Sequence, residues 1–270
     1  MAPKKPKPAP VRPEKCLNCE TPLTDCFCPK CGQNNSDERL HLSQIAGHLM
    51  DEFLEFDLPF LKTIWQLTIR PGKVCLEYTA GFRKRYSNPF RYCLLMMAAY
   101  IFLLNALELG LVKGQVTFSG QPVAEEERTR FIELIEQFPL FVQGHLNTFM
   151  FLALPFVALA LKLISRRAKL NYAEHYVFIL FIYGQRSVFS MMLIPLAFIY
   201  DINVMKTAIL TMSFLFTTWG ATVFYRTNVL IGFLKTIVIH LTLFLVMLPM
   251  ILIAWLLFIL LPAWLRGELG

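Results

Sequence analysis

Charged residues are scarce in this chain, and this scarcity limits the classes of protein to which the chain can belong. Only 17% of the 270 residues are charged, whereas 56% are hydrophobic. An ordinary soluble domain has about a quarter charged residues. This composition disfavours a disordered chain and a soluble enzyme. Together with apolar runs of about 20 residues or more, it favours a multi-pass membrane protein.

Catalytic signatures are also missing. The sequence has no P-loop, GxGxxG, GxSxG or HExxH motif, and no paired carboxylates inside its apolar runs. Ser187 and Ser190 lie near Arg186 but lack the base and the orienting residue of a catalytic triad. We therefore do not expect an enzyme.

A secretory leader is not expected at the start of the chain. The first residues are basic and rich in proline, and no apolar segment follows them. Residues 1–14 are therefore predicted to form a disordered tail. The first membrane span then has to act as the insertion signal.

Two CxxC pairs form the most specific motif of the sequence. Cys16 and Cys19 make the first pair, and Cys28 and Cys31 make the second, eight residues later. Two such turns can direct four thiolates at one ion, so residues 15–34 are predicted to form a zinc ribbon with a closed, structural site. A module of ~20 residues cannot bury a sufficient core without its metal.

Two alternatives to this ligand set need consideration. A pair of disulfides would need an oxidising compartment, and the expected absence of a secretory leader argues against one. Cys26 could replace Cys28 as a ligand, but Cys28 completes the second CxxC pair with Cys31. We therefore prefer zinc bound by Cys16, Cys19, Cys28 and Cys31.

Residues 35–91 are predicted to form amphipathic helices. One helix begins near Ser43 and ends near Phe56, and a second begins near Asp57 and ends before Arg70. Neither is long enough to span a membrane. We expect them beneath the membrane domain or at its interface.

A set of short motifs extends over most of the chain. The motif residues are Cys28-Pro29-Lys30-Cys31-Gly32-Gln33, Arg70-Pro71-Gly72, Glu77-Tyr78, Gly81, Arg83, Tyr86, Pro89 and Tyr172-Ala173-Glu174-His175. In these motifs the chain resembles a widespread bacterial family of multi-pass membrane proteins that has a short N-terminal zinc ribbon and a domain of unknown function. The resemblance implies the architecture and a membrane location, but no activity, substrate or catalytic residue.

Basic and aromatic side chains gather just before the first apolar run. They are Arg83, Lys84, Arg85, Tyr86 and Arg91. Such residues are attracted to a layer of lipid headgroups, where each cation contributes about 1 kcal/mol. We favour a simpler role, in which the charges hold this flank on the cytoplasmic side. Membrane lipids are expected partners in either case.

Five apolar runs are long enough to span a membrane. They cover residues 92–112, 146–165, 176–200, 204–226 and 233–262. The sequence therefore predicts an all-α bundle of about five transmembrane helices over 92–265, with an external loop at 113–145 that contains an amphipathic helix. The last run is unusually long, so it tilts, kinks near Pro249, or forms a hairpin of two short passes.

The distribution of positive charge predicts the orientation. With the N terminus in the cytoplasm, the inner segments hold 20 Lys and Arg residues and the outer segments hold five. This bias predicts a cytoplasmic N terminus and an external C terminus in a bacterial cytoplasmic membrane. Because the net charge of +7 is explained in this way, we do not expect a nucleic-acid partner.

Five polar side chains fall inside or at the end of apolar runs. They are Asn105, Glu108, Gln185, Arg186 and His240. A charge at membrane depth is costly and usually faces the bundle interior or a wet cavity. Arg186 is expected near the midplane, where Asn105 and His240 are easier to reach than Glu108. We expect a polar network that fixes helix packing, and a pocket for an ion, a proton or a lipid headgroup is the alternative.

The ribbon and the bundle together determine the expected function. The leading hypothesis is a non-enzymatic membrane scaffold or regulator whose ribbon binds a cytosolic protein. The alternative is a transporter, a channel or a lipid-handling protein with a polar pocket around Arg186. The sequence leaves the substrate, the partner and homo-oligomerisation open.

Overall fold

The computed structural model describes residues 14–24, 27–33, 58–107 and 128–265. Within these ranges the regular elements are helices, and strands are absent apart from one antiparallel bridge between Lys15 and Pro22. Almost all of the predicted tail lies outside the described residues, and so does the helix predicted between Ser43 and Phe56. Cys26 and Glu108 also lie outside them.

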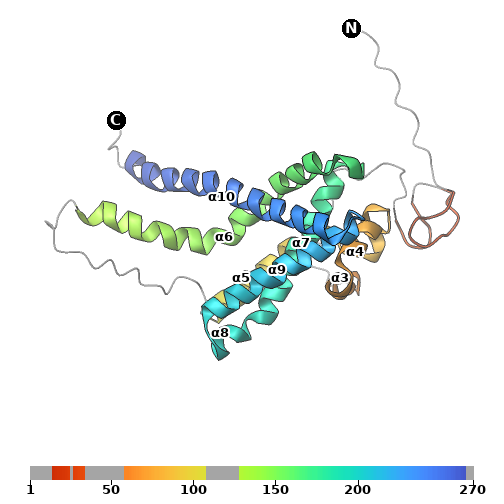
Figure 1. Ribbon diagram of the computed structural model, residues 1–270, viewed down its shortest axis with the longest axis horizontal. Helices are drawn as coiled ribbons and strands as arrows, with labels where there is room; N and C mark the ends of the chain where they lie inside the picture. Colours follow the sequence, from red (N-terminus) through yellow and green to blue (C-terminus); the bar gives the residue numbers. More distant parts are fainter. Residues whose placement is uncertain (1–13, 25–26, 34–57, 108–127, 266–270) are drawn as a thin grey trace, which may run out of the picture.

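The described helices occupy most of the chain after the ribbon (Figure 1). They are α3 (Leu58–Ile69), α4 (Pro71–Thr79), η1 (Arg83–Arg85), α5 (Pro89–Ala106), α6 (Arg128–Ile164), η2 (Arg166–Ala168), α7 (Tyr172–Leu193), α8 (Pro195–Ile199), α9 (Ile202–Phe224) and α10 (Val229–Leu265). The helix predicted between Asp57 and Arg70 corresponds to α3. The sequence analysis does not predict α4.

Within the described residues, five helical segments are long and apolar enough to cross a membrane. They are Arg83–Ala106, His145–Ile164, Tyr172–Ile199, Ile202–Phe224 and Val229–Leu257. Their number agrees with the five apolar runs of the sequence. The mostly helical architecture is confirmed for the described part of the chain, and its five apolar segments indicate a membrane protein.

Helix α6 is longer than the sequence predicts. It continues from Arg128 to Ile164 and so joins the second span to the segment assigned to the external loop 113–145. Pro139 lies inside α6 and weakens it locally, because proline lacks a backbone N–H. The helix nevertheless continues alongside α10 (Figure 1), and packing between the two long helices offsets this local cost.

The last apolar run forms one helix rather than a hairpin of two short passes. Helix α10 extends from Val229 to Leu265 and contains Pro249. No Gly, Asn or Asp follows Pro249 within the helix to form a turn. A lone proline kinks a helix but does not reverse the chain.

Helix α7 is the centre of the bundle. In the span that contains α7, 72% of the apolar window is buried, against 17% in α10. A capping box starts the helix, because Asn171 Oδ1 accepts from the Glu174 amide and Glu174 Oε2 accepts from the Asn171 amide. Helices α3, α4, α5, α6 and α9 all contact α7.

The start of α5 lies beside the middle of α7. A Cβ atom on Gly184 would lie 2.7 Å from the Tyr92 ring and 3.1 Å from Cys93 Cα, so glycine permits this contact. Gly184 follows Tyr172, the first residue of α7, by ~18 Å along the helix. This leaves space beside the first half of α7, where Tyr78 of α4 packs edge-on against Phe181.

Helix α4 is buried within the bundle, although the sequence predicts helices beneath the membrane domain or at its interface. Pro71 occupies its first turn, where the missing N–H is not needed. The buried residues are Pro71, Gly72, Val74, Cys75 and Tyr78. They pack between α7 and α9.

Two glycines allow α4 and α9 to approach closely. A Cβ atom on Gly72 would lie 2.6 Å from the Gly220 carbonyl oxygen and 2.8 Å from the Phe224 amide nitrogen. Both are backbone atoms, which cannot move aside as the end of a flexible side chain can. The crossing therefore requires glycine at position 72.

We predict that Gly72→Ala lowers the stability of the purified protein. Overpacking at a tight contact costs ~1–3 kcal/mol, so the thermal unfolding midpoint in detergent should fall. Lys73→Ala is the matched control, because Lys73 is exposed and its 3.9 Å pair with Glu77 is a surface ion pair. An unchanged midpoint in Gly72→Ala would contradict the crossing.

Candidate metal centre and buried polar sites

Two equivalent turns build the cysteine cluster. The Glu20 amide donates to the Cys16 carbonyl, and the Gly32 amide donates to the Cys28 carbonyl, each over 2.9 Å. The residue after each CxxC pair has a positive φ, +60° at Glu20 and +67° at Gly32. The repeated backbone geometry directs both pairs to the same place.

The four cysteines predicted as ligands lie together. The Sγ atoms of Cys16, Cys19, Cys28 and Cys31 are within 4.8 Å of one another, and the closest pairs are 3.5–3.6 Å apart. A disulfide would hold two sulfurs at ~2.05 Å, so these four thiols are free. Four sulfurs 2.3 Å from one tetrahedral ion would be ~3.8 Å apart. The arrangement is compatible with a bound metal ion.

The thiols of this cluster differ in acidity. The Thr21 hydroxyl lies 3.2 Å from Cys19 Sγ and lowers the pKa of Cys19 to about 6. Burial raises the pKa of Cys31 to about 11. Because cysteine binds metals as the thiolate, Cys19 offers an ionised sulfur at neutral pH, whereas a metal ion has to displace a proton from Cys31.

The ribbon is attached to the loop that precedes α5. The Gln33 side chain is buried, and its Nε2 donates to the Gly81 carbonyl over 2.6 Å while its Oε1 accepts from the Lys84 amide over 3.4 Å. Leu17 packs on Gly81, where a Cβ atom would lie 2.7 Å from Leu17 Cδ1 and where φ is +112°. The cysteine cluster and the helical bundle are joined by this contact.

Glu77 of α4 fixes the same loop from the other side. The Tyr86 hydroxyl donates to Glu77 Oε2 over 2.6 Å, and Arg85 Nη1 lies 3.3 Å from the same oxygen. Tyr86 is therefore buried against α4. This differs from the predicted role, in which its ring meets lipid headgroups.

The other residues predicted at the headgroup layer also pack inward in part. Arg91 is 4% exposed and lies over the Phe60 ring, 6.0 Å from its centroid. Lys84 is exposed, whereas Arg83 and Arg85 are partly buried. In this basic segment Arg85 therefore contacts α4 and Arg91 contacts α3.

Gln185 lies fully buried in α7 and connects three helices. Its Nε2 donates to Thr68 Oγ1 of α3 over 2.8 Å, and its Oε1 accepts from the Tyr92 hydroxyl of α5. An amide in an apolar interior is costly unless it is paired. This contact therefore specifies how α3, α5 and α7 meet.

Arg186 faces a different neighbour from Gln185. Its Nη1 lies 3.1 Å from Met150 Sδ of α6, and its guanidinium carbon lies 5.6 Å from the centroid of the Tyr183 ring. Consecutive residues of a helix point about 100° apart, because there are 3.6 residues in each turn. Adjacent positions in the sequence therefore reach different helices.

Hydrogen bonds do not join the predicted intramembrane residues to one another in the described part of the chain, although Arg186 is close enough to act electrostatically on His240. His240 Nδ1 lies 2.9 Å from the Thr236 carbonyl oxygen of its own helix, and Asn105 is exposed. In the part of the chain that the structure describes, no hydrogen bond links Gln185, Arg186, His240 and Asn105 to one another. Gln185 instead binds α3 and α5, Arg186 contacts α6, and His240 bonds within its own helix.

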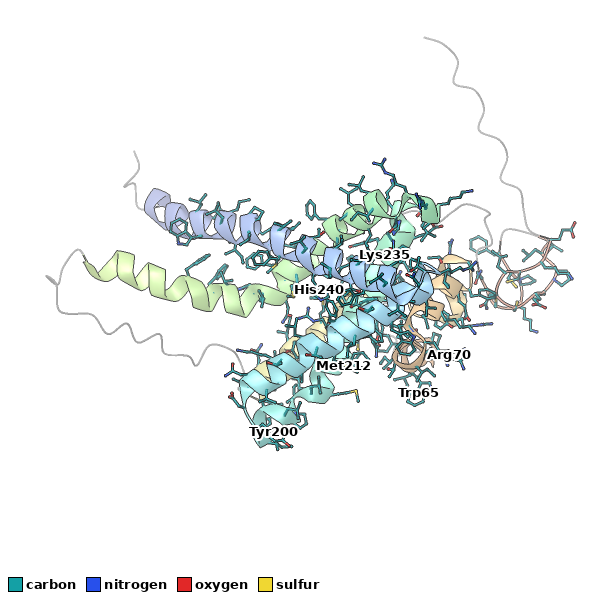
Figure 2. The ribbon with its side chains drawn as sticks, viewed as in Figure 1. Trp65, Arg70, Tyr200, Met212, Lys235 and His240 are labelled. Carbon is teal, nitrogen blue, oxygen red and sulfur yellow. The ribbon has the colours of Figure 1, made fainter. Side chains whose placement is uncertain are left out.

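A polar cluster that the sequence analysis does not assign lies where α6 ends and α10 begins. Lys235, labelled in Figure 2, is only 8% exposed. Its ammonium donates to Ser165 Oγ and lies 4.1 Å from the centroid of the Tyr225 ring. The Tyr225 hydroxyl lies 2.7 Å from His175 Nδ1. The sequence contains one indication of this cluster: Lys235 is the only charged residue of the long apolar helix α10.

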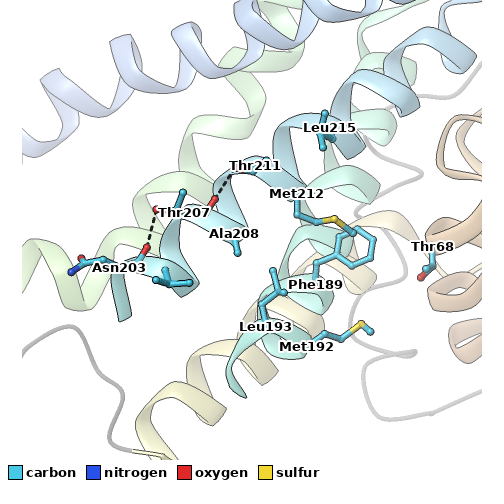
Figure 3. A pocket seen from close by; sticks show the side chains of 11 residues that line it. Thr68, Phe189, Met192, Leu193, Asn203, Thr207, Ala208, Thr211, Met212 and Leu215 are labelled. Carbon is cyan, nitrogen blue, oxygen red and sulfur yellow. Dashed lines mark hydrogen bonds between the residues drawn. The ribbon is translucent and has the colours of Figure 1, made fainter. Parts of the chain in front are cut away.

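Two cavities lie on the surface of the bundle. The larger, of about 860 Å³, lies between α7 and α9 and reaches Thr68 of α3 (Figure 3). Thr207 and Thr211 line it, but their hydroxyls donate to carbonyls one turn earlier in α9 and leave a mainly apolar wall. The smaller, of about 670 Å³, lies between α6 and α10. Arg186 lines neither of these two cavities.

Comparison with protein families adds one match. Residues 57–101 match a family described as a protein of unknown function, DUF3667. The matched segment contains α3, α4, η1 and the first part of α5, and thus the loop on which the ribbon lies. No curated protein and no solved structure matches the chain.

We predict that Gln33→Ala releases the ribbon from the loop. Each lost hydrogen bond removes about 1 kcal/mol, so hydrogen exchange at the Lys84 amide should become about fivefold faster or more. Exchange is measured by mass spectrometry on peptides that contain residues 81–86. Lys30→Ala, which removes an exposed side chain from the same ribbon, should leave this exchange rate unchanged, and equal rates in wild type and Gln33→Ala would refute the attachment.

Proposed function

We propose that this chain is a non-enzymatic membrane scaffold or regulator with a structural zinc ribbon. The observation that carries the proposal is the buried Gln33 side chain, whose two hydrogen bonds attach the ribbon to the loop from Gly81 to Lys84. A catalytic metal site keeps an open coordination position, whereas four thiolates fill the shell of a tetrahedral ion. The ribbon then has a mechanical role, which is to hold a partner at one end of the bundle.

Zinc is the metal that we propose for this ribbon. Soft thiolate ligands in a tetrahedral arrangement favour zinc over magnesium or calcium, which prefer oxygen ligands. Lys15 and Lys30 are exposed on the ribbon and offset part of the negative charge of four thiolates. In this proposal Cys16, Cys19, Cys28 and Cys31 are the ligands.

The partner would contact the part of the ribbon that the loop leaves uncovered. Leu17 and Gln33 face the loop, whereas Phe27 is 60% exposed and Lys30 is also exposed. Protein interfaces are centred on aromatic anchors of this kind. We therefore propose that Phe27 is the main contact for a protein partner.

We further propose that the ribbon lies in the bacterial cytoplasm and that the C terminus is external. The support is the excess of Lys and Arg in the segments on the ribbon side, 20 against five. A reducing compartment also keeps cysteines available as thiolates rather than disulfides. The partner would accordingly be a cytosolic protein.

A site-specific photo-crosslinking experiment tests this function. A photoreactive amino acid at position 27 should give a discrete protein adduct in intact cells, whereas the same amino acid at Phe244, an exposed position of α10, should give lipid adducts. Cys31→Ser should abolish the position-27 adduct and reduce the zinc content from about one ion per chain to none, because it removes one of four ligands. Cys26→Ser should keep both.

Two results would overturn the proposal. Full zinc occupancy in Cys31→Ser would refute the ligand set. An adduct at position 27 that contains only lipid, or that persists without zinc, would refute the ribbon as a site for a protein partner.

The alternative function is a transporter, a channel or a lipid-handling protein centred on Arg186. The observation that favours it is the surroundings of the guanidinium, which contacts a methionine sulfur and a tyrosine ring. Among the described residues, the ion pairs involve Glu77 and not Arg186. An arginine in a membrane span with such neutral neighbours is suited to an anionic ligand.

Replacement of Arg186 tests this alternative. Arg186→Met removes the insertion cost of the charge, ~2.5–3.5 kcal/mol, and loses contacts of similar size, so the unfolding midpoint should change little. If the alternative is correct, this variant loses co-purifying anionic lipid or a measurable flux, and Arg186→Lys keeps part of that property. Unchanged lipid content and flux in a folded Arg186→Met protein would exclude it.

A further inference from the structure

Two lysines belong to the junction of α6 and α10. The Lys235 ammonium donates to the hydroxyl of Ser165, the residue that follows the last residue of α6, and Lys162 lies in the last turn of that helix. Lys162 and Lys235 are both close enough to act electrostatically on His175. The end of α6 and the start of α10 therefore contribute two basic side chains and one hydroxyl to this junction.

This pair of charges has no carboxylate partner within the described residues. The ion pairs there join Glu77 to Lys73 and to Arg85. Glu174 of α7 uses its carboxylate to accept from the Asn171 amide. Because a buried ammonium is costly without a counter-charge, the junction favours an anion.

Exposed apolar side chains flank the same junction. Ile164, beside Ser165, is 56% exposed, and Leu234, beside Lys235, is 52% exposed. Both belong to helices that are long and apolar enough to cross a membrane. An anion bound between them would have hydrocarbon surface next to it, which is the arrangement that a phospholipid needs.

We propose that Lys162, Ser165 and Lys235 form a binding site for the phosphate of an anionic membrane lipid. The two ammonium groups supply charge, and the Ser165 hydroxyl donates to a phosphate oxygen. The Tyr225 ring holds the Lys235 ammonium in place by a cation–π contact. The acyl chains lie along Ile164 and Leu234, so that the lipid connects α6 to α10.

Native mass spectrometry of the full chain in detergent tests this site. The protein is titrated with dioleoylphosphatidylglycerol and, separately, with dioleoylphosphatidylcholine, whose headgroup is zwitterionic. Wild type should prefer phosphatidylglycerol, and Lys235→Met and Lys162→Met should each bind it about fivefold more weakly or worse. Lys206→Met removes an exposed cation of α9 and should bind it as wild type does.

Binding to the Lys162→Met and Arg186→Met variants decides the outcome even if Lys235→Met does not fold. If Lys235→Met fails to fold, the exposed Lys162 decides the outcome, because its replacement leaves the buried contacts intact. Arg186→Met should retain phosphatidylglycerol binding, which separates this site from the one proposed at Arg186. Equal affinity for the two lipids, or equal losses in Lys162→Met and Lys206→Met, would overturn the proposal. Displacement of the lipid by inorganic phosphate would reassign the site to a free anion.

Discussion

The close crossing of α4 and α9 at Gly72 determines the position of much of the N-terminal half. It buries α4 beside α7 and so places Glu77 where it binds Tyr86 and Arg85. Glu77 in turn holds the loop whose backbone receives Gln33 from the ribbon. Without room for this crossing, the loop would lose its support and the ribbon its attachment. A contact between two helices thus controls the position of a cysteine cluster outside the bundle.

The helices could be predicted from local signals, whereas their packing could not. Apolar runs of sufficient length identify five candidate spans, and α3 follows its predicted bounds. The continuation of α6 through Pro139 depends on α10, which is distant in sequence. The burial of α4 depends likewise on Gly220, which lies far along the chain. Neither long-range partner is apparent from the local sequence of α4 or α6.

The same distinction applies to the candidate sites. The four cysteines come together because each CxxC pair is a local turn, which a sequence displays directly. The intramembrane residues were grouped by depth alone, but Gln185 and Arg186 point to different helices. The depth of a residue in the membrane gives only its level in the bundle. The rotation of each helix about its own axis decides which residues at that level come into contact. The contact of Lys235 with Ser165 was missed for the same reason, since it joins the start of one helix to the end of another.

The position of α10 illustrates how polar contacts select neighbours inside a membrane. Apolar side chains gain little from exchanging lipid for another helix, so close packing and hydrogen bonds decide which helices associate. Only 17% of the apolar window of α10 is buried, yet its first turns contain two polar contacts. Thr236 binds Thr218 of α9 over 3.1 Å, and Lys235 binds Ser165, which directly follows α6. Apolar substitutes at these two positions would still allow α10 to enter a membrane, but the helix would lose the contacts that orient it between α6 and α9.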